Sequence, residues 1–255
     1  MARNPHTPAR QICAESTRPP VTNRNRSSRV RKWVRSHSLS LVAILLFLFS
    51  FVGQVLTGRA EYNQDQESHG EPSVTLVQYL GTGHFGEATM ENWESEFLQM
   101  AVFIFLTAFL VQRGSAESRK PDDDPEAGKE PIDEDPRLHR NDPTAPWPVR
   151  RGGIALALYR NSLTIALFLL FLAAFWGHAA AGAAEFSAEQ AAHGEPGAGT
   201  LAYLGTSRFW FESFQNWQSE FLSVFALTVL SIWLRQQGSP ESKPVHAPHE
   251  QTGEE

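Results

Sequence analysis

Two stretches of this 255-residue chain decide its fold: LSLVAILLFLFSFV at Leu39–Val52 and LTIALFLLFLAAFW at Leu163–Trp176. Both are apolar on every side of a helix, whereas a surface helix of a soluble protein has one apolar face. They belong to longer apolar runs, 39–56 and 163–181, and a membrane span needs roughly 20 such residues. The alternatives are a buried helical hairpin of a soluble protein and, for the first run alone, a cleaved signal peptide.

The chain also repeats itself. A shift of 124 residues aligns 38–118 with 162–242 without a gap, and about 40% of the aligned positions are identical. Each copy holds a second, shorter apolar run, at 97–111 and at 221–234. These runs reach spanning length only if their helices begin near Asn92 and Asn216. The repeat therefore predicts two hairpins of two spans each, and it argues against a signal peptide because the second copy lies in mid-chain.

Positive charges predict the orientation. Six basic residues at 24–35 precede the first span, and further arginines and a lysine lie at both ends of the segment between the two copies. The connection inside each copy holds one basic residue, Arg59 or Arg208. Because cytoplasmic loops are enriched in Lys and Arg, both termini are expected in the cytoplasm. Both hairpins then share one orientation and are related by a pseudo-two-fold axis along the membrane normal.

The predicted fold class is all-α: an integral membrane four-helix bundle with short extracytoplasmic interfacial helices and disordered tails. Its parts are a basic cytoplasmic tail (1–35), the first hairpin (36–113), a cytoplasmic linker (114–150), the second hairpin (151–237) and a C-terminal cytoplasmic tail (238–255). The tails and linker are predicted to be disordered because they hold few large apolar residues. The single cysteine, Cys13, excludes an intramolecular disulfide and a cysteine-based metal cluster.

The motif HGEP, at 69–72 and 193–196, is a weak candidate metal site. Its candidate ligands are His69, Glu71, His193 and Glu195, since imidazole and carboxylate suit zinc or another divalent ion. The spacing does not match a helical H-E-x-x-H site. The alternative is a tight turn in which these side chains bond to nearby backbone.

The motif YLGT, at 79–82 and 203–206, predicts a short interfacial helix that ends at a glycine. Tyr79 and Tyr203 are expected at headgroup depth, where amphipathic rings anchor membrane proteins. Trp93 and Trp217, in the next motif, are expected to act as anchors in the same way.

The motif N-W-x-S-E-F-L, at 92–98 and 216–222, supplies the candidate ion or proton site. On a helix, Asn92 and Glu96 share one face, as do Asn216 and Glu220. Carboxylates at a membrane edge usually face the bundle interior and are functional candidates. His178, on the third span, is expected to face the same interior. The alternative is capping, because the helix dipole stabilises an acid near a helix N-terminus.

HGEP, YLGT and N-W-x-S-E-F-L together resemble a family of small bacterial membrane proteins that is catalogued only as a domain of unknown function. The resemblance covers both repeats and neither tail. It implies the cytoplasmic membrane of a bacterium and carries over no functional residue.

The expected function is that of a non-enzymatic structural or accessory membrane component, because no catalytic motif stands out. The first alternative is an ion, proton or small-solute conductor that uses the two membrane-edge glutamates. A metal-dependent membrane enzyme that uses the HGEP residues is a third. No cofactor and no nucleic-acid partner are expected. The expected partners are the lipid bilayer, anionic lipid at the basic N-terminal tail, and a second copy or another membrane protein.

Overall fold

The computed structural model describes residues 24–125, 127–129, 132 and 134–253. These residues form helices and turns and contain no strand, which confirms the all-α prediction. The chain divides into two compact units, Met1–Gln54 and Val55–Glu255, with the boundary inside one long helix. The elements are α1 (Arg24–Ser36), α2 (Ser38–Ser68), α3 (Leu76–Tyr79), α4 (Gly83–Thr107), η2 (Pro136–His139), α5 (Trp147–Arg151), α6 (Gly153–Tyr159), α7 (Ser162–Ala192), α8 (Thr200–Tyr203) and α9 (Ser207–Leu230).

The basic N-terminal segment is partly helical. Residues 1–23 of the predicted tail lie outside the described residues. The rest of it forms α1, whose end is closed where the His37 N–H donates to the Trp33 carbonyl at 3.1 Å. The Trp33 and His37 rings also stack, with centroids 4.7 Å apart. The arginines and the lysine before the first apolar run are therefore carried on a helix, where the composition predicted disorder.

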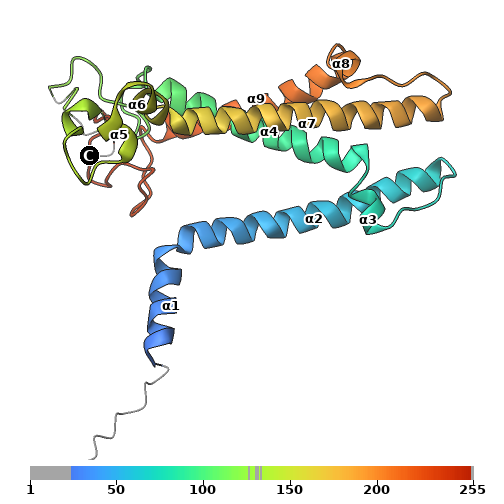
Figure 1. Cartoon of the computed structure of the whole chain (residues 1–255), viewed down its shortest axis with the longest axis horizontal. Helices are drawn as coiled ribbons and strands as arrows, with labels where there is room; N and C mark the ends of the chain where they lie inside the picture. The colour runs from blue at the N-terminus through green and yellow to red at the C-terminus, as the bar shows by residue number, and fades with distance from the viewer. Residues whose placement is uncertain (1–23, 126, 130–131, 133, 254–255) are drawn as a thin grey trace, which may run out of the picture. The chain divides into compact units, whose positions relative to one another are not determined.

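In the second unit, α4 packs along α7 and also contacts α9 (Figure 1). Helices of the first and second hairpins therefore share one assembly. Gly83 lets α4 begin directly against α7, since a Cβ at this position would lie 2.5 Å from the Glu185 backbone nitrogen. The short helix α8 packs against α7.

The two hairpins have the same local structure. Their long helices begin at 38 and 162, their short helices at 76 and 200, and their next helices at 83 and 207. Thr82 caps α4 by accepting the Phe85 N–H, and Thr206 caps α9 by accepting the Phe209 N–H. The repeat offset of 124 residues thus holds for helix starts and for caps.

The loop after each long helix is held at the same place by a different side chain. In the first hairpin Asn63 accepts the Val74 N–H at 2.7 Å and donates to the Val74 carbonyl at 3.1 Å. In the second, Ser187 Oγ accepts the Ala198 N–H at 3.1 Å and lies 3.1 Å from the Ala198 carbonyl and 2.7 Å from the Ala183 carbonyl, one of which receives its single proton. In either copy, a polar side chain therefore satisfies hydrogen-bonding groups of the extended loop backbone.

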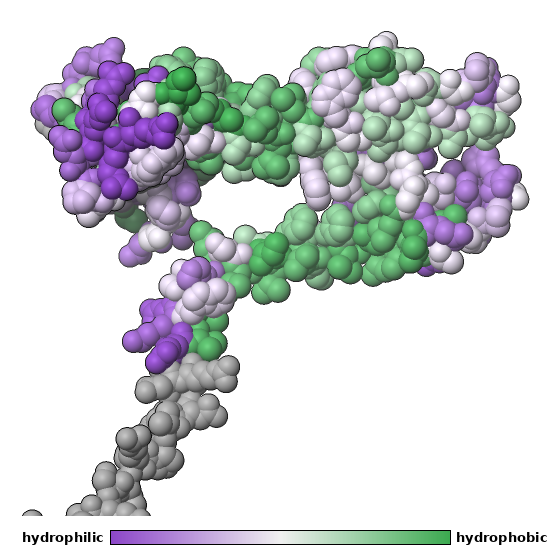
Figure 2. All heavy atoms as spheres, viewed as in Figure 1, coloured by the Kyte–Doolittle hydropathy of each residue, from purple (hydrophilic) through white to green (hydrophobic). Residues whose placement is uncertain are grey.

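Among the residues that the structure describes, two helices are long and apolar enough to cross a membrane: α2 and α7, each with 31 residues. Figure 2 shows hydrophobic residues along the middle of the assembly of α4, α7 and α9, with hydrophilic residues gathered at its ends. α4 and α9 do not meet the same criterion, because polar residues fill their first halves. Their remaining apolar ends are about 16 Å long at 1.5 Å per residue, against a hydrocarbon core of about 30 Å.

The linker and the C-terminal tail were predicted to be disordered, yet the structure ties them together. The buried Lys243 ammonium donates to the carbonyls of Gly114, His249 and Gln251 at 2.6–2.9 Å. The Gly114 N–H donates to Thr252 Oγ1 at 2.8 Å. The prediction of disorder rested on composition alone, and composition does not reveal polar contacts such as these.

The motif Q-x-G-S-x-E-S occurs at 112–118 and at 236–242, and it forms the same turn in both places. The Gln112 N–H donates to Ser118 Oγ at 2.7 Å, and the Gln236 N–H donates to Ser242 Oγ at 2.9 Å. The motif is therefore a turn that follows α4 and α9, in which a serine hydroxyl satisfies a backbone donor.

Candidate functional site

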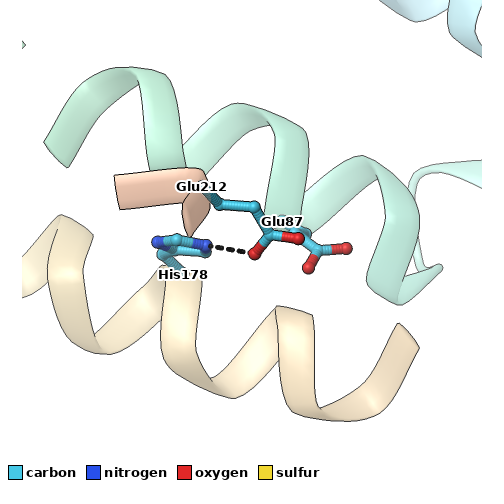
Figure 3. A group of neighbouring side chains, drawn as sticks. All are labelled: Glu87, His178 and Glu212. Carbon is cyan, nitrogen blue, oxygen red and sulfur yellow. Dashed lines mark hydrogen bonds and ion pairs between the residues drawn. The ribbon is translucent and has the colours of Figure 1, made fainter. Parts of the chain in front are cut away.

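A buried cluster of acids, a histidine and a tyrosine lies where four helices of the second unit meet. We call it the acid–histidine cluster. α4 supplies Glu87 and Glu94, α7 supplies His178, α8 supplies Tyr203 and α9 supplies Glu212. Figure 3 shows Glu212 directed at His178, with the Glu87 carboxylate beside that of Glu212. Buried charged groups are costly unless they are paired, so the hydrogen bonds and ion pairs within this cluster matter for the stability of the fold.

His178 is fully buried and lies between two carboxylates. Its Nδ1 lies 2.8 Å from Glu94 Oε2, and its Nε2 lies 3.3 Å from Glu212 Oε2. The other oxygen of Glu94 accepts the Trp217 Nε1–H at 3.0 Å. A carboxylate accepts hydrogen bonds and does not donate them, so Nδ1 of His178 carries a proton and donates it to Glu94. The imidazole is thereby held in one orientation, with Nε2 directed at α9.

Tyr203 bridges the two remaining carboxylates. Its hydroxyl lies 2.8 Å from Glu87 Oε1 and 2.8 Å from Glu212 Oε2. A hydroxyl has one proton, so it can donate to only one of the two oxygens at a time. Burial and the bonds to both carboxylates raise the pKa of Tyr203.

A glycine makes room for this bridge. A Cβ at Gly182 would lie 2.5 Å from Tyr203 Cε1 and 2.8 Å from Glu87 Oε1. Real Cβ atoms do not approach other atoms so closely, and close backbone approach is a common reason for glycine in a helix. The position of Tyr203 against α7 therefore depends on the absence of a side chain at 182.

Arg208 closes the cluster on its more accessible side. Its Nε donates to Glu212 Oε1 at 2.9 Å, its Nη1 donates to Glu189, and its Nη2 lies 3.7 Å from Glu87 Oε2. Glu212 therefore has three partners in the cluster: Arg208 at Oε1, and Tyr203 and His178 at Oε2. Arg208 is about one-third exposed, so this edge of the cluster borders solvent.

The arrangement supports two kinds of chemistry. Carboxylates that share a hydroxyl proton can take up a further proton, and three of the groups can also converge on a metal ion. One ligand atom each from Glu87, His178 and Glu212 lies within 4.8 Å of the others. The described residues show no other group of three such side chains this close together.

The predicted ion or proton site lies further along α4 and α9. Glu96 is exposed and Glu220 is half-buried, and the two are close enough for their charges to interact. The Asn92 amide donates to the Ala88 carbonyl at 2.6 Å, and the Asn216 amide donates to the Glu212 carbonyl at 3.1 Å. Each asparagine thus bonds back to its own helix, one turn earlier.

The HGEP residues lie at a helix end in both copies. His69 Nδ1 lies 3.0 Å from the Asp65 carbonyl, and His193 Nδ1 lies 2.8 Å from the Glu189 carbonyl. The backbone N–H groups of Glu71 and Glu195 reach back to the carbonyls of Gln66 and Gln190, both at 2.9 Å. All four proposed ligands are exposed. This geometry is a helix C-cap with a glycine in the left-handed region.

The predicted anchors take different positions. Tyr79 and Tyr203, expected at headgroup depth, are both buried in the protein. Trp217 is half-buried and bonded to Glu94, and Trp93 is half-buried at the equivalent position of α4. The short helices α3 and α8 that carry the two tyrosines are present, and each ends before the glycine of YLGT.

Sequence reasoning identified His178 as facing the interior but did not select Glu87, Glu94 or Glu212. The predicted sites were drawn chiefly from positions at which the two copies agree, whereas these three acids lie at positions where the copies differ. Their counterparts at the offset of 124 are Phe211, Gln218 and Ala88. An acid in one copy opposite a neutral residue in the other was therefore the available signal.

The fold and the site define a class: an all-helical protein with two helices able to span a membrane and a buried acid–histidine cluster beside one of them. The chain belongs to the family described as Domain of unknown function (DUF6766), whose model matches residues 30–254. The match extends through the linker and into the C-terminal tail, which the resemblance of the three motifs did not cover. No curated protein and no solved structure matches the chain.

Proposed function

We propose that this chain is a multipass protein of the bacterial cytoplasmic membrane, made of two copies of one helical hairpin, with both termini in the cytoplasm. α2 and α7 have the length and hydropathy of spans. α4 and α9 are proposed to complete the crossings, although their first halves are polar. That polarity is tolerated in a membrane protein when it faces other helices, and Glu94 and Ser95 of α4 are buried.

The proposed role is that of a non-enzymatic structural or accessory component. The observation that supports it most is the acid–histidine cluster, which joins α4 of the first hairpin to α7, α8 and α9 of the second. Its groups are bonded to each other, and the absence of a side chain at Gly182 lets Tyr203 fill the space between the helices. Such a cluster fixes how the two hairpins pack.

Cysteine labelling in intact cells tests the topology. Cys13 is first replaced by serine, and single cysteines are then introduced as Glu71→Cys, Glu195→Cys and Asn141→Cys, all at exposed positions. With four spans, a membrane-impermeant maleimide labels the first two variants from outside and labels Asn141→Cys only after permeabilisation. If α2 crosses and α4 does not, Asn141→Cys is labelled in intact cells, and the proposed topology is wrong.

A second candidate function is cation or proton conduction past Glu96 and Glu220. It is favoured by the interaction between their charges on two packed helices. Flux into liposomes that contain the purified full chain tests it, with the Glu96→Gln/Glu220→Gln double variant for comparison. Conduction through these groups requires the double variant to lose the flux. Equal flux from the two proteins would exclude it.

A further inference from the structure

The surroundings of His178 are those of a histidine that binds a metal. Metal-binding histidines commonly donate their second ring N–H to a carboxylate, which fixes the tautomer and the ring orientation. Glu94 holds Nδ1 of His178 in this way at 2.8 Å, and Trp217 in turn holds Glu94. Without a metal, a proton on Nε2 can be donated to Glu212 Oε2, 3.3 Å away, and when that proton is lost the Nε2 lone pair is available to a metal ion.

With a neutral imidazole, the cluster lacks one positive charge or one proton. The single Tyr203 proton faces oxygens of Glu87 and Glu212 at 2.8 Å each. If both carboxylates are ionised, Tyr203 donates its proton to one of these two oxygens, and the other oxygen faces a lone pair of the hydroxyl. Arg208 does not remedy this, because its Nε binds the other oxygen of Glu212. A second proton on the imidazole, carried by His178 Nε2 3.3 Å from Glu212 Oε2, or a bound cation in its place would satisfy that oxygen.

We propose that Glu87, His178 Nε2 and Glu212 bind a divalent transition-metal ion, with Glu94 as the positioning residue for the imidazole. In a tetrahedral site with bonds of about 2.1 Å, ligand atoms lie about 3.4 Å apart. His178 Nε2 and Glu212 Oε2 are already 3.3 Å apart, and no pair among the three ligand atoms is separated by more than 4.8 Å. Small side-chain rotations therefore suffice to close the site.

The ligand set also indicates which metal binds. An imidazole with carboxylates suits zinc and its neighbours, whereas calcium and magnesium prefer all-oxygen sites. The three groups include no sulfur, which disfavours Cu(I). Tyr203 Oη lies next to both carboxylates and is the group available for a fourth position. Access is from the edge where Glu212 and Arg208 are part-exposed.

The first hairpin provides an internal control. At the repeat offset, His178 corresponds to Gln54 and Glu212 corresponds to Ala88. A second site of this type therefore cannot form by the repeat symmetry, and one ion per chain is expected. The topology proposed above places this metal site on the outer side of the membrane. The binding of the metal itself does not depend on that topology.

Zinc binding to the purified full chain, without a polyhistidine tag, tests the proposal. The protein is stripped with a chelator, equilibrated with Zn²⁺ in detergent and analysed for bound metal, with Ca²⁺ and Mg²⁺ as comparison ions. We expect one Zn²⁺ per chain and at least 100-fold weaker binding for Glu87→Gln and Glu212→Gln, which keep side-chain size. The matched control is His69→Ala/His193→Ala, which removes two exposed imidazoles and should bind like the wild type.

Cobalt spectra separate a ligand from a positioning residue. Co²⁺ bound to the wild type should show the visible absorption of a four-coordinate ion, and His178→Gln should lose it. Glu94→Gln should keep that spectrum while affinity falls about 10–100-fold. If His178→Gln does not fold, Glu87→Gln and Glu212→Gln decide the question.

Two results would overturn the metal site: a wild type that retains no Zn²⁺, or ligand variants that bind as it does. The labelling pattern of the three cysteine variants is independent of metal. A failed metal site with the expected labelling therefore leaves the membrane proposal standing, and the reverse result leaves the metal site standing.

Discussion

The two hairpins share a scaffold and differ in what the scaffold holds. In both, a tyrosine of YLGT packs against a glycine of the preceding helix, Tyr79 on Gly58 and Tyr203 on Gly182. In the first hairpin the tyrosine hydroxyl lies 3.3 Å from an imidazole nitrogen of His84, which also pairs with the exposed Glu61. In the second it bridges two buried carboxylates. The comparison teaches that the identical positions build the frame, and the divergent positions build the site.

The largest expected effect comes from removing the buried histidine of the second hairpin, His178. His178→Ala leaves Glu94 buried without its charged partner, which should lower the free energy of unfolding by about 3–5 kcal/mol. Unfolding of the detergent-solubilised protein in the presence of a chelator measures this. The matched change in the first hairpin, His84→Ala, should cost less than about 1 kcal/mol, since Glu61 is exposed. Equal losses would remove the distinction between the hairpins.

The tyrosine hydroxyls should rank in the same order. Tyr203→Phe removes a proton from between two buried carboxylates and should destabilise the protein by about 1–3 kcal/mol. Tyr79→Phe removes one long hydrogen bond and should cost less than about 1 kcal/mol. Thermal unfolding of both variants under one condition gives the comparison. A larger loss for Tyr79→Phe would show that the first hairpin holds the more important polar contact.

The two glycine–tyrosine contacts can be separated by a rescue experiment. Gly182→Ala should cost about 1–3 kcal/mol, because the new methyl group meets the Tyr203 ring itself. Gly58→Ala meets chiefly the hydroxyl oxygen of Tyr79. Adding Tyr79→Phe should therefore restore the stability of Gly58→Ala, while adding Tyr203→Phe should not restore that of Gly182→Ala. Rescue at both positions, or at neither, would contradict the described geometry.

The smallest expected effect concerns the caps of the short helices. Thr75 caps α3 with a reciprocal pair of bonds to Gln78, whereas Gly199, its counterpart, gives α8 no side-chain cap. Gly199→Thr should raise stability by no more than a few tenths of a kcal/mol, and Thr75→Gly should lower it by a similar amount. A shift in the melting temperature of less than a few degrees is expected for each. Opposite signs would show that the two short helices are not equivalent.

Much of the scaffold could be predicted from the sequence. Apolar runs placed α2 and α7, and the plain-turn interpretation of HGEP matches the helix ends at Gly70 and Gly194. These features depend on local chemistry, so local patterns report them. The later helices were expected to begin near Asn92 and Asn216, but α4 and α9 begin nine residues earlier, where Thr82 and Thr206 cap them. α1 and the polar contacts of the linker and tail could not be predicted from composition, because they depend on individual caps and on contacts such as Lys243 with Gly114.

The site itself depends on contacts between distant segments. Glu94 and His178 lie 84 residues apart, and Tyr203 and Glu87 lie 116 apart. No periodicity within one helix indicates which face of α4 meets α7, so Glu87 and Glu94 could not be distinguished from ordinary surface acids. Glu96 recurs as Glu220, whereas none of the three acids of the cluster recurs in the other copy. The positions at which the two copies differ are the ones that indicate the cluster.

The central claim is that the acid–histidine cluster couples the two hairpins, and a double-mutant cycle on Glu94 and His178 tests it most directly. The free energy of unfolding is measured with chelator present for the wild type, Glu94→Ala, His178→Ala and the double variant. Because these side chains are buried and 2.8 Å apart, we predict a coupling energy above about 1 kcal/mol. Losses that simply add, with a coupling below about 0.3 kcal/mol, would contradict the account.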